Sequence, residues 1–261
     1  MVRPKKHLGQ HFLHDRKIAG KIVDSLQVPA GSDRYVLEIG PGTGVLTAFL
    51  VERFPGRLHL VEIDPESVDH LHKVFPSLGH HIIQGDFLQL DLDILFNEPF
   101  VIIGNFPYNI SSQIFFHILD HRNSIEQVVC MLQKEVADRL SAQHGSKVYG
   151  ILSVLLQAYY DVEALFKVSP GAFKPPPKVM SAVIRLRRNK RRELPCDELL
   201  FRTIVKQSFQ KRRKTLRNAL KHLNLPGSVS TLGLMDKRPE QLSVDDYIFL
   251  TQQIGNREAV R

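Results

Sequence analysis

The sequence predicts an α/β protein with a mostly parallel, doubly wound sheet, followed by a small all-helical lobe. Short, β-branched apolar runs alternate with amphipathic helical stretches along most of the chain, as a parallel sheet with crossover helices requires. A glycine-rich turn at residues 40–44 separates the first such run from a helix. After Arg188 the apolar spacing becomes helical, so we expect two domains, residues 1–188 and residues 189–261.

Length and composition are those of an ordinary globular protein. The chain has 261 residues, 43% of them hydrophobic and 24% charged, enough to bury a sizeable core. No stretch approaches the roughly 18 apolar residues of a membrane span, and the N-terminus lacks the apolar core of a signal peptide. We expect a cytoplasmic protein with no membrane partner. Cys130 and Cys196 are isolated, so the sequence suggests neither a disulfide framework nor a zinc site.

The predicted elements alternate in a regular order. Buried strands are expected at residues 35–40, 58–63, 81–85, 100–104 and 128–132. Helices are expected to start at Ser111 and to cover residues 15–26, 45–54, 134–140, 150–160, 199–209, 211–223 and 245–254. Residues 162–168 and 179–186 have the pattern of a β-hairpin, with the proline-rich stretch 173–178 as its stiff loop.

The first strand, the glycine turn and the next helix open a nucleotide-binding βαβ unit. Glycines let the backbone approach a ligand at the helix N-terminus, where free N–H groups favour a carboxylate or phosphate. Glu62 follows Gly40 by 22 residues and ends the second strand, where an acid can accept hydrogen bonds from both ribose hydroxyls. The pattern indicates an adenosine-containing ligand, and it fits dinucleotide enzymes as well as methyltransferases.

Asp86 follows the third predicted strand. A carboxylate at that place can accept a hydrogen bond from the exocyclic amine of an adenine. The alternative is that Asp86 simply caps the following turn.

The tetrapeptide Asn105 to Tyr108, Asn-Phe-Pro-Tyr, follows the buried strand 100–104 and so lies where open α/β sheets place their ligands. Asn105 offers a side-chain carbonyl, Pro107 fixes a backbone angle, and Tyr108 supplies a flat aromatic face. Together they suit a planar amine. An ordinary strand-to-loop turn with an exposed Tyr is the alternative.

Positive charge is concentrated in one segment. Residues 185–221 hold 14 Lys and Arg against three acids, a local charge of +11 within a net charge of +8. Such a segment on a near-neutral body is typical of proteins that bind polyanions, because each neutralised phosphate releases counterions. Lys211 to Lys214 start a predicted helix whose opposite face is apolar, and we expect this cluster to contact phosphates. A solvated helix face is the alternative.

Several motifs together carry a resemblance that spans nearly the whole chain. These segments are residues 7–13, 36–47, 61–64, 85–87, 105–108, 173–181 and 209–220. In this order they resemble the ribosomal small-subunit adenine dimethyltransferases, the KsgA or RsmA family. The resemblance implies a Rossmann-like class I methyltransferase domain, residues 1–188, with a small all-helical RNA-binding domain, residues 189–261.

The resemblance also implies an activity. S-adenosylmethionine would be the methyl donor, with no metal, and the substrate would be two adjacent adenines near the 3′ end of small-subunit (16S) rRNA. The partner would be an immature small ribosomal subunit, bound by a monomer. Carried over by motif, the cofactor site would consist of His11, Leu13, Gly40, Glu62, Asp86 and Asn105.

Two departures from the family pattern stand out. Gln-His-Phe-Leu replaces the frequent Gln-Asn-Phe-Leu, which leaves open whether the His11 side chain or only its backbone contacts the cofactor. Phe106 replaces the commoner Leu or Ile, and this should be harmless because the expected contribution of that position is its backbone carbonyl.

The chemistry follows from the amine. An adenine amino nitrogen is a poor nucleophile because its lone pair is delocalised into the ring. The Asn105 side-chain oxygen and the Phe106 carbonyl can accept hydrogen bonds from the two N–H groups of this amine. The nitrogen lone pair then turns towards the methyl carbon of the donor, and in-line displacement follows. Tyr108 and Phe173 on the two faces of the base would replace the stacking lost from the RNA, at about 1–3 kcal/mol per base.

Three other readings stay open. The first is a large-subunit rRNA adenine methyltransferase of the macrolide-resistance type. The segment 209–220 disfavours it, because this segment resembles the KsgA family. The second is an amino-methyltransferase acting on DNA adenine or on a protein glutamine; the Phe173 loop and the basic lobe favour RNA. The third is a non-catalytic RNA-binding assembly factor.

Overall fold

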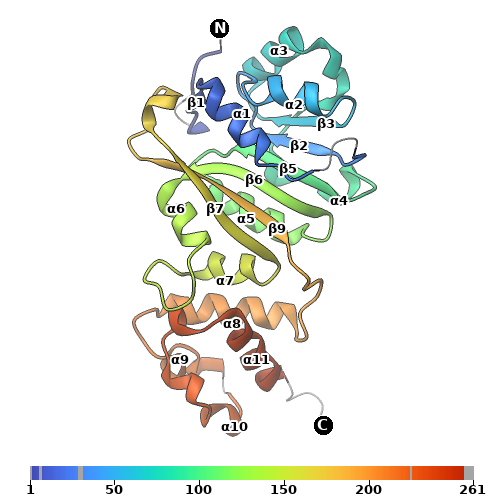
Figure 1. The fold of residues 1–261 in the computed structure, drawn as a ribbon. Coiled ribbons are helices and arrows are strands. Elements are labelled where there is room, and N and C mark those ends of the chain that lie inside the picture. The colour runs from blue at the N-terminus through green and yellow to red at the C-terminus, as the bar shows by residue number, and fades with distance from the viewer. Residues whose placement is uncertain (1, 6–7, 29–31, 224, 256–261) are drawn as a thin grey trace. The chain divides into compact units, whose positions relative to one another are not determined.

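The computed structural model describes residues 2–5, 8–28, 32–223 and 225–255. Its centre is a seven-stranded sheet (Figure 1) with the order β4-β3-β2-β5-β6-β9-β7. Five strands are parallel, namely β2 (Val36–Ile39), β3 (Leu58–Glu62), β4 (Ile82–Gln84), β5 (Phe100–Asn105) and β6 (Ile125–Gln133). The predicted α/β class and all five predicted parallel strands are confirmed.

The strand order contains a topological switch point. From β2 the chain moves outwards through β3 to β4, then returns to place β5 on the other side of β2. In open α/β sheets the ligand site lies at such a point, outside the carboxyl ends of the strands. β9 (Ser181–Arg188) pairs antiparallel with β6 and lies next to β7 (Tyr160–Val168), as the hairpin prediction required.

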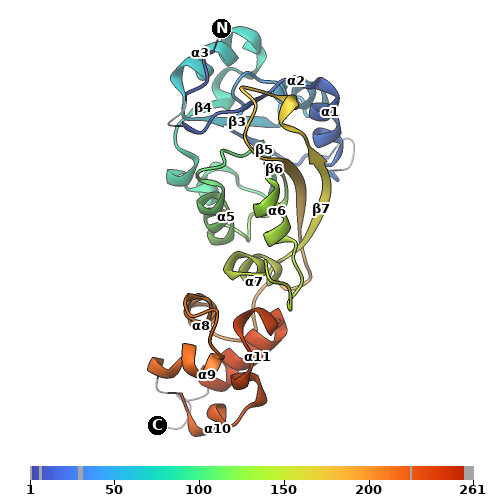
Figure 2. The same cartoon turned by 90° about the vertical axis from the view of Figure 1, so that its left-hand side faces the viewer.

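Helices cover both faces of the sheet (Figure 2). On one face, α1 (Arg16–Asp24), α2 (Thr47–Arg53) and α3 (Pro65–Val74) bury apolar side chains against β2, β3 and β5 in one continuous core. On the other face, α5 (Ser111–Asp120) buries the side chains predicted to face inwards, Ile114, Phe115, Ile118 and Leu119. Asp15 and Asp64 start α1 and α3 by accepting hydrogen bonds from backbone N–H groups of the first turn.

A two-stranded sheet that the sequence did not predict joins distant parts of the chain. β1 (Phe12–Leu13) pairs antiparallel with β8 (Phe173–Lys174), with Phe12 opposite Lys174 and Leu13 opposite Phe173. Strands of two residues have no detectable periodicity, so no sequence pattern indicated them. The pairing holds the N-terminal segment against the proline-rich loop.

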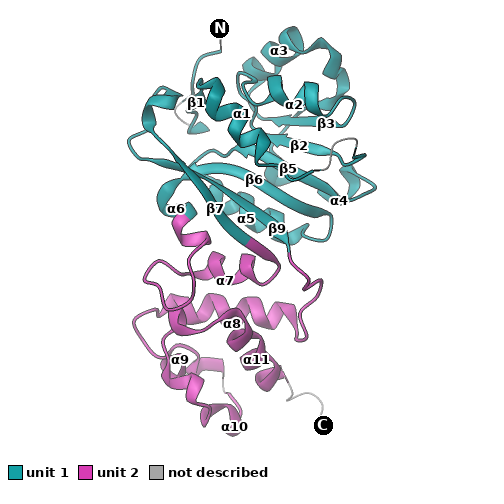
Figure 3. Cartoon of the chain, in the orientation of Figure 1, with its two compact units in different colours: residues 1–137, 162–188 teal, residues 138–161, 189–261 magenta. Residues whose placement is uncertain are grey.

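The chain divides into two compact units, Met1–Ala137 with Val162–Arg188 and Asp138–Asp161 with Asn189–Arg261 (Figure 3). The predicted boundary at residue 188 therefore coincides with a boundary in the structure. The assignment of residues 138–161 to the first domain was wrong. This segment contains α7 (Ile151–Gln157), which packs against α8 (Glu198–Gln210) and α11 (Val244–Gly255) of the second unit.

The basic cluster of the second unit does not start a helix, contrary to the prediction. α8 ends at Gln210, Lys211–Lys214 form a turn, and only α9 (Leu216–Ala219) is α-helical within the expected helix 211–223. The extended backbone of Thr215 breaks the helix, and the Leu216 N–H bonds to the carbonyl of Lys237. Leu216, Ala219 and Leu220 are buried as expected, whereas Leu223 is only partly buried.

The remaining helices are short. α4 (Leu92–Leu95) precedes β5, and α6 (Lys134–Leu140) follows β6 as predicted. In the second unit, α10 (Gly227–Ser230) and several 3₁₀ turns lead to α11, which lies at the predicted place. None of the helices in the described ranges is long and apolar enough to span a bilayer. His7, the first residue of the motif 7–13, and residues 256–261 lie outside the described residues.

Candidate active site

A cavity of about 340 Å³ opens at the carboxyl ends of β2 to β5, beside the switch point. Its wall is built from residues 8–12, 39, 40, 42, 61–63, 85–88, 105–110, 113 and 114. Seven of the nine predicted site residues line it, namely His11, Gly40, Glu62, Asp86, Asn105, Phe106 and Tyr108. The fold therefore brings together groups that lie up to about a hundred positions apart in the sequence.

The glycine turn gives the cavity room at the end of β2. Gly40 and Gly42 have φ values of 62° and 56°, in the left-handed region that side chains disfavour. A Cβ atom at Gly42 would lie 2.8 Å from the Phe12 ring, so a larger residue would push the N-terminal segment away. A Cβ at Gly40 would meet nothing within 4 Å, so only its backbone conformation demands glycine.

Glu62 presents a buried carboxylate to this cavity. One oxygen accepts a hydrogen bond from the Gly42 N–H at 3.0 Å, and the other accepts one from the Asp64 N–H at 2.9 Å. Its side chain is 3% exposed, and burial raises the pKa of the carboxyl, although these two N–H groups favour the charged form. Each oxygen keeps lone pairs for a ligand, which suits a vicinal diol.

Asp86 caps the following turn and also lines the cavity. One of its oxygens accepts the Leu88 N–H at 3.0 Å. The second oxygen accepts no hydrogen bond within the described part of the chain. It is therefore available to an amine.

Asn105 is oriented by the N-terminal segment. Its Nδ2 donates to the backbone carbonyl of His11 at 2.9 Å, which fixes the side-chain plane and leaves Oδ1 as an acceptor. No group among the described residues donates to Oδ1. The preceding Gly104 is required by close approach, since a Cβ there would lie 2.6 Å from the Ile39 carbonyl.

Phe106 and Tyr108 complete the tetrapeptide. Phe106 is buried and its N–H bonds to the carbonyl of Met131 at 2.9 Å, which fixes the peptide that follows the strand. The Tyr108 hydroxyl bonds to the Ser181 hydroxyl, and burial raises the pKa of the phenol. Its ring faces the His11 imidazole, with 5.5 Å between centroids and 29° between planes.

Two predicted site residues do not line this cavity. Leu13 has a buried side chain and borders a separate chamber of about 20 Å³, together with Glu38 and Asn105. Phe173 is 2% exposed and belongs to the apolar core, because β8 holds it opposite Leu13. In this conformation Phe173 is not placed to stack on a base in the cavity.

The sequence did not indicate how the N-terminal segment is anchored above the cavity. The Lys5 ammonium pairs with the buried carboxylate of Asp64, and this hydrogen bond raises the pKa of the amine. Gln10 Nε2 donates to the same carboxylate at 3.4 Å, and Gln10 Oε1 accepts the Lys5 N–H at 2.8 Å. Because residues 8–12 form one wall, these contacts hold that wall in place.

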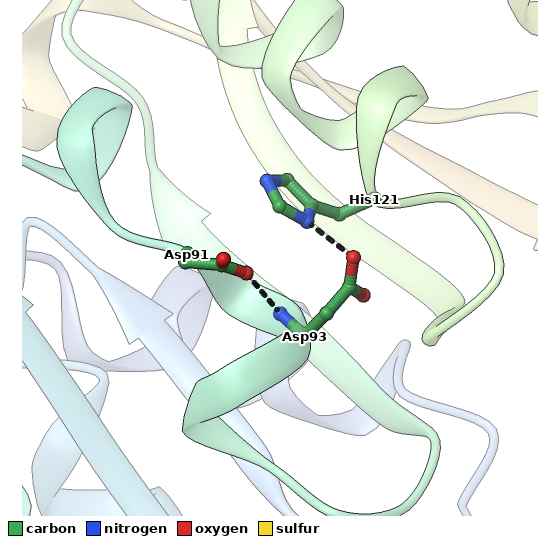
Figure 4. Close-up of side chains that lie close together, drawn as sticks. All are labelled: Asp91, Asp93 and His121. Atoms are coloured by element: carbon green, nitrogen blue, oxygen red, sulfur yellow. Dashed lines mark hydrogen bonds and ion pairs between the residues drawn. The ribbon is translucent and has the colours of Figure 1, made fainter.

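A second cluster of polar groups lies where the start of α4 meets the end of α5. Asp91, Asp93 and His121 bring possible metal ligands within 4.8 Å of one another (Figure 4). Asp91 caps α4, because its side chain accepts a hydrogen bond from the Asp93 N–H at 3.1 Å. The Asp93 carboxylate accepts a hydrogen bond from His121 Nδ1 at 2.9 Å. These bonds explain the cluster as a helix cap and an ion pair, and we assign it no ligand.

Comparisons with known proteins agree with this arrangement. A family model described as ribosomal RNA adenine dimethylase matches residues 1–254. The chain is 54% identical to "Ribosomal RNA small subunit methyltransferase A" of Cytophaga hutchinsonii over 98% of this chain and 99% of that one. It is 57% identical to the protein of the same name from Parabacteroides distasonis, over 96% of this chain and 94% of that one.

Solved structures show the same architecture. A dimethyladenosine transferase from Plasmodium falciparum matches with a TM-score of 0.78 and 26% identity, over 92% of this chain and 96% of that one. The 23S rRNA methyltransferase ErmE matches with a TM-score of 0.69 and 27% identity, over 93% and 100%. These matches confirm the Rossmann-like class I methyltransferase fold. The chain belongs to the ribosomal RNA adenine dimethylase family.

Proposed function

We propose that this protein transfers methyl groups from S-adenosylmethionine to the N6 amino groups of two adjacent adenines near the 3′ end of small-subunit (16S) rRNA, within an immature small ribosomal subunit. The observation that carries the proposal is the Asn105 side-chain oxygen, which accepts no hydrogen bond from the described residues and is fixed in the same cavity as the acids Glu62 and Asp86. An amine acceptor beside an adenosine-type site is what methylation of an amino group requires.

The cavity residues fit the cofactor. Glu62 would accept the two ribose hydroxyls, and Asp86 would accept the adenine amine with its uncapped oxygen. Gly40, the backbone of His11 and Asn105 would surround the methionine part. When bound, S-adenosylmethionine supplies an electrophilic methyl group on a sulfonium.

The chain's own residues would prepare the nucleophile. The Asn105 oxygen and the Phe106 carbonyl would accept hydrogen bonds from the two N–H groups of the target amine. These hydrogen bonds would localise the nitrogen lone pair. Tyr108 would stack on the base and hold it in line with the methyl group, so most of the rate would come from proximity. These steps call for no metal. We also propose that the protein acts as a monomer in the cytoplasm.

Sequence similarity favours the small-subunit substrate over its nearest rival. The relatives named as small-subunit enzymes are 54% and 57% identical to this chain, whereas the 23S enzyme ErmE is 27% identical. The test is incubation with labelled S-adenosylmethionine and immature small subunits, large subunits or DNA. Label is expected in the small-subunit rRNA alone. Label in large subunits or DNA would support a rival enzyme, and cofactor-independent binding without label would support an assembly factor.

Glu62→Ala is expected to weaken S-adenosylmethionine binding by about tenfold or more, since hydrogen bonds to a charged group contribute roughly 1.5–3 kcal/mol. Isothermal calorimetry measures the affinity. Glu62→Gln is the matched control for the fold, because its amide oxygen still accepts one of the two backbone N–H groups. Unaltered affinity in Glu62→Ala, with a normal melting curve, would reassign Glu62 to a structural role.

The basic turn, Lys211–Lys214, allows a second comparison between a variant and a matched control. Lys211, Arg213 and Lys214 are exposed. In contrast, Arg212 donates to the Lys147 carbonyl and lies 3.8 Å from the Glu240 carboxylate, so it holds the second unit together. We propose that the exposed three contact rRNA phosphates and that Arg212 does not.

Replacing Arg213 and Lys214 with Ala is expected to weaken binding to the small subunit and to flatten its salt dependence. The slope of log affinity against log salt should fall by up to about 0.9 per lost contact, and by less on single-stranded RNA. Arg212→Ala should instead lower the melting temperature and keep the slope. A wild-type slope in the double variant would show that the turn is only a solvated surface.

A further inference from the structure

We propose that Lys5 and Asp64 form a latch that holds the N-terminal segment against the cavity and sets how tightly S-adenosylmethionine is bound. Neither residue lines the cavity, so both act as positioning residues. The inference rests on the proposed function and deepens it, because it adds to the proposed cofactor contacts an ion pair outside the site that controls them.

The N-terminal segment is held at two places. Residues 8–12 form a wall of the cavity, and the pairing of β1 with β8 fixes the end of that wall. Ahead of it, Lys5 Nζ donates to one oxygen of the Asp64 carboxylate, and Gln10 Nε2 donates to the other at 3.4 Å. Gln10 Oε1 also accepts the Lys5 N–H at 2.8 Å, which joins the two donors. The second attachment is an ion pair and therefore depends on charge.

Asp64 connects this attachment to the proposed ribose acceptor. Its backbone N–H donates to Glu62 Oε1 at 2.9 Å. Its carboxylate caps α3 by accepting the Glu66 N–H at 3.2 Å and the Ser67 hydroxyl at 3.1 Å. The residue that binds Lys5 thus also orients the Glu62 carboxylate. A change at the latch reaches both the wall and the ribose acceptor.

The pair joins a buried acid to a partly exposed base. Asp64 is 1% exposed, whereas the Lys5 side chain is 31% exposed. Burial alone would raise the pKa of Asp64, but hydrogen bonds from Lys5 and Gln10 hold it below its usual value, so the acid is charged at neutral pH. A buried carboxylate that loses its cation is destabilised, which keeps the segment closed. Without Lys5 the carboxylate keeps Gln10, Ser67 and the Glu66 N–H, so the segment loosens while the fold remains.

The test is a double-mutant cycle on the full-length protein without rRNA. Calorimetry gives the affinity for S-adenosylmethionine, and stopped-flow displacement gives its dissociation rate. Lys5→Met is expected to weaken binding by about three- to tenfold, between the effect of an exposed ion pair and that of a hydrogen bond to a buried charge. The loss should appear as faster dissociation. Asp64→Asn keeps an oxygen to cap α3 and should have a similar effect. The double variant should be no weaker than the single ones, because each removes the same interaction.

Salt separates a latch from a general loosening of the fold. The wild-type affinity should fall more steeply than that of Lys5→Met as salt rises towards about 1 M, because screening weakens the ion pair. Lys73→Met is the matched control, since it removes an exposed cation from the last turn of α3, and it should keep the wild-type affinity and salt dependence.

Methylation kinetics give a further readout. In Lys5→Met the KM for S-adenosylmethionine should rise, while kcat at saturating cofactor should change by less than about twofold. The reason is that Asn105 bonds to His11, beside the attachment that β1 and β8 keep.

The latch is refuted if Lys5→Met binds S-adenosylmethionine with the wild-type affinity and salt dependence. Additive losses in the double variant, or a loss confined to kcat, would refute it as well. A wild-type protein that binds the cofactor but does not methylate small subunits would refute the proposed function instead, and the binding measurements would still decide the latch.

Discussion

Asn105→Ala is expected to lower kcat for methyl transfer by at least about tenfold. The Asn105 oxygen is the side-chain acceptor proposed for the target amine, and one such hydrogen bond, at roughly 1.5 kcal/mol, corresponds to about one decade in rate. Single-turnover methylation of immature small subunits, at saturating cofactor, measures the loss directly. The effect should lie in kcat, because the bond matters most while the nitrogen lone pair is being localised.

The control for this substitution concerns the N-terminal segment. Removing the amide also removes its bond to the His11 carbonyl, so part of any loss could come from a displaced wall. Asn105→Asp keeps a side-chain oxygen but cannot donate to that carbonyl, and it should show the same displacement without the same loss of acceptor. A turnover in Asn105→Ala equal to that of the wild type, with a normal melting curve, would contradict the mechanism.

Glu38 gives the second large effect, on stability instead of rate. This carboxyl is 1% exposed on β2, and burial raises its pKa from 4.5 to about 8. The Thr47 hydroxyl, which donates to it at 2.7 Å, opposes the shift, and the nearby charge of Glu62 adds to it. At neutral pH the native protein therefore holds Glu38 as a neutral acid.

The sign of the pH dependence follows from this raised pKa. The unfolded chain releases the proton near pH 4.5 and the folded protein near pH 8, so Glu38 favours the fold below pH 4.5 and loses this contribution as the pH rises to 8. A pKa shift of this size changes the free energy of unfolding by a few kcal/mol, to an order of magnitude. For a chain of this length, that change corresponds to several degrees in melting temperature.

Glu38→Gln isolates the effect, because glutamine has the shape of the neutral acid and cannot ionise. Melting temperatures measured without cofactor at pH 5 and pH 9 should differ by several degrees less in Glu38→Gln than in the wild type. The remaining carboxyls and histidines titrate equally in both proteins. The same pH dependence in both would mean that Glu38 is already ionised in the native state.

The elements that the sequence predicted share a local cause. A strand buried on both faces must be apolar along its whole length, so β2 to β6 were visible as uninterrupted runs. The acids Glu62 and Asp86 were predictable because they directly follow such runs, and the carboxyl ends of parallel strands meet at one edge. His11 and Leu13 have no such signal and were assigned only by resemblance.

The errors share a different cause, since each depends on contacts between distant residues. Leu216, Ala219 and Leu220 have helical spacing, but the Leu216 N–H finds its partner at Lys237, and no local pattern shows that the helix starts late. Residues 138–161 look like part of an α/β domain until α7 is seen to pack on α8 and α11. Phe173 looked like a loop residue because its partner strand is only two residues long.

The pairing of β1 with β8 makes the cavity dependent on the order in which the chain is synthesised. One of its walls is contributed by residues 8–12, yet the contact that holds His11 to Pro175 joins positions 164 residues apart. A nascent chain that already contains the glycine turn, Glu62 and Asn105 still lacks the partner of its own first strand. The wall formed by residues 8–12 can therefore be fixed by this pairing only after β8 has left the ribosome, later than both sides of the switch point.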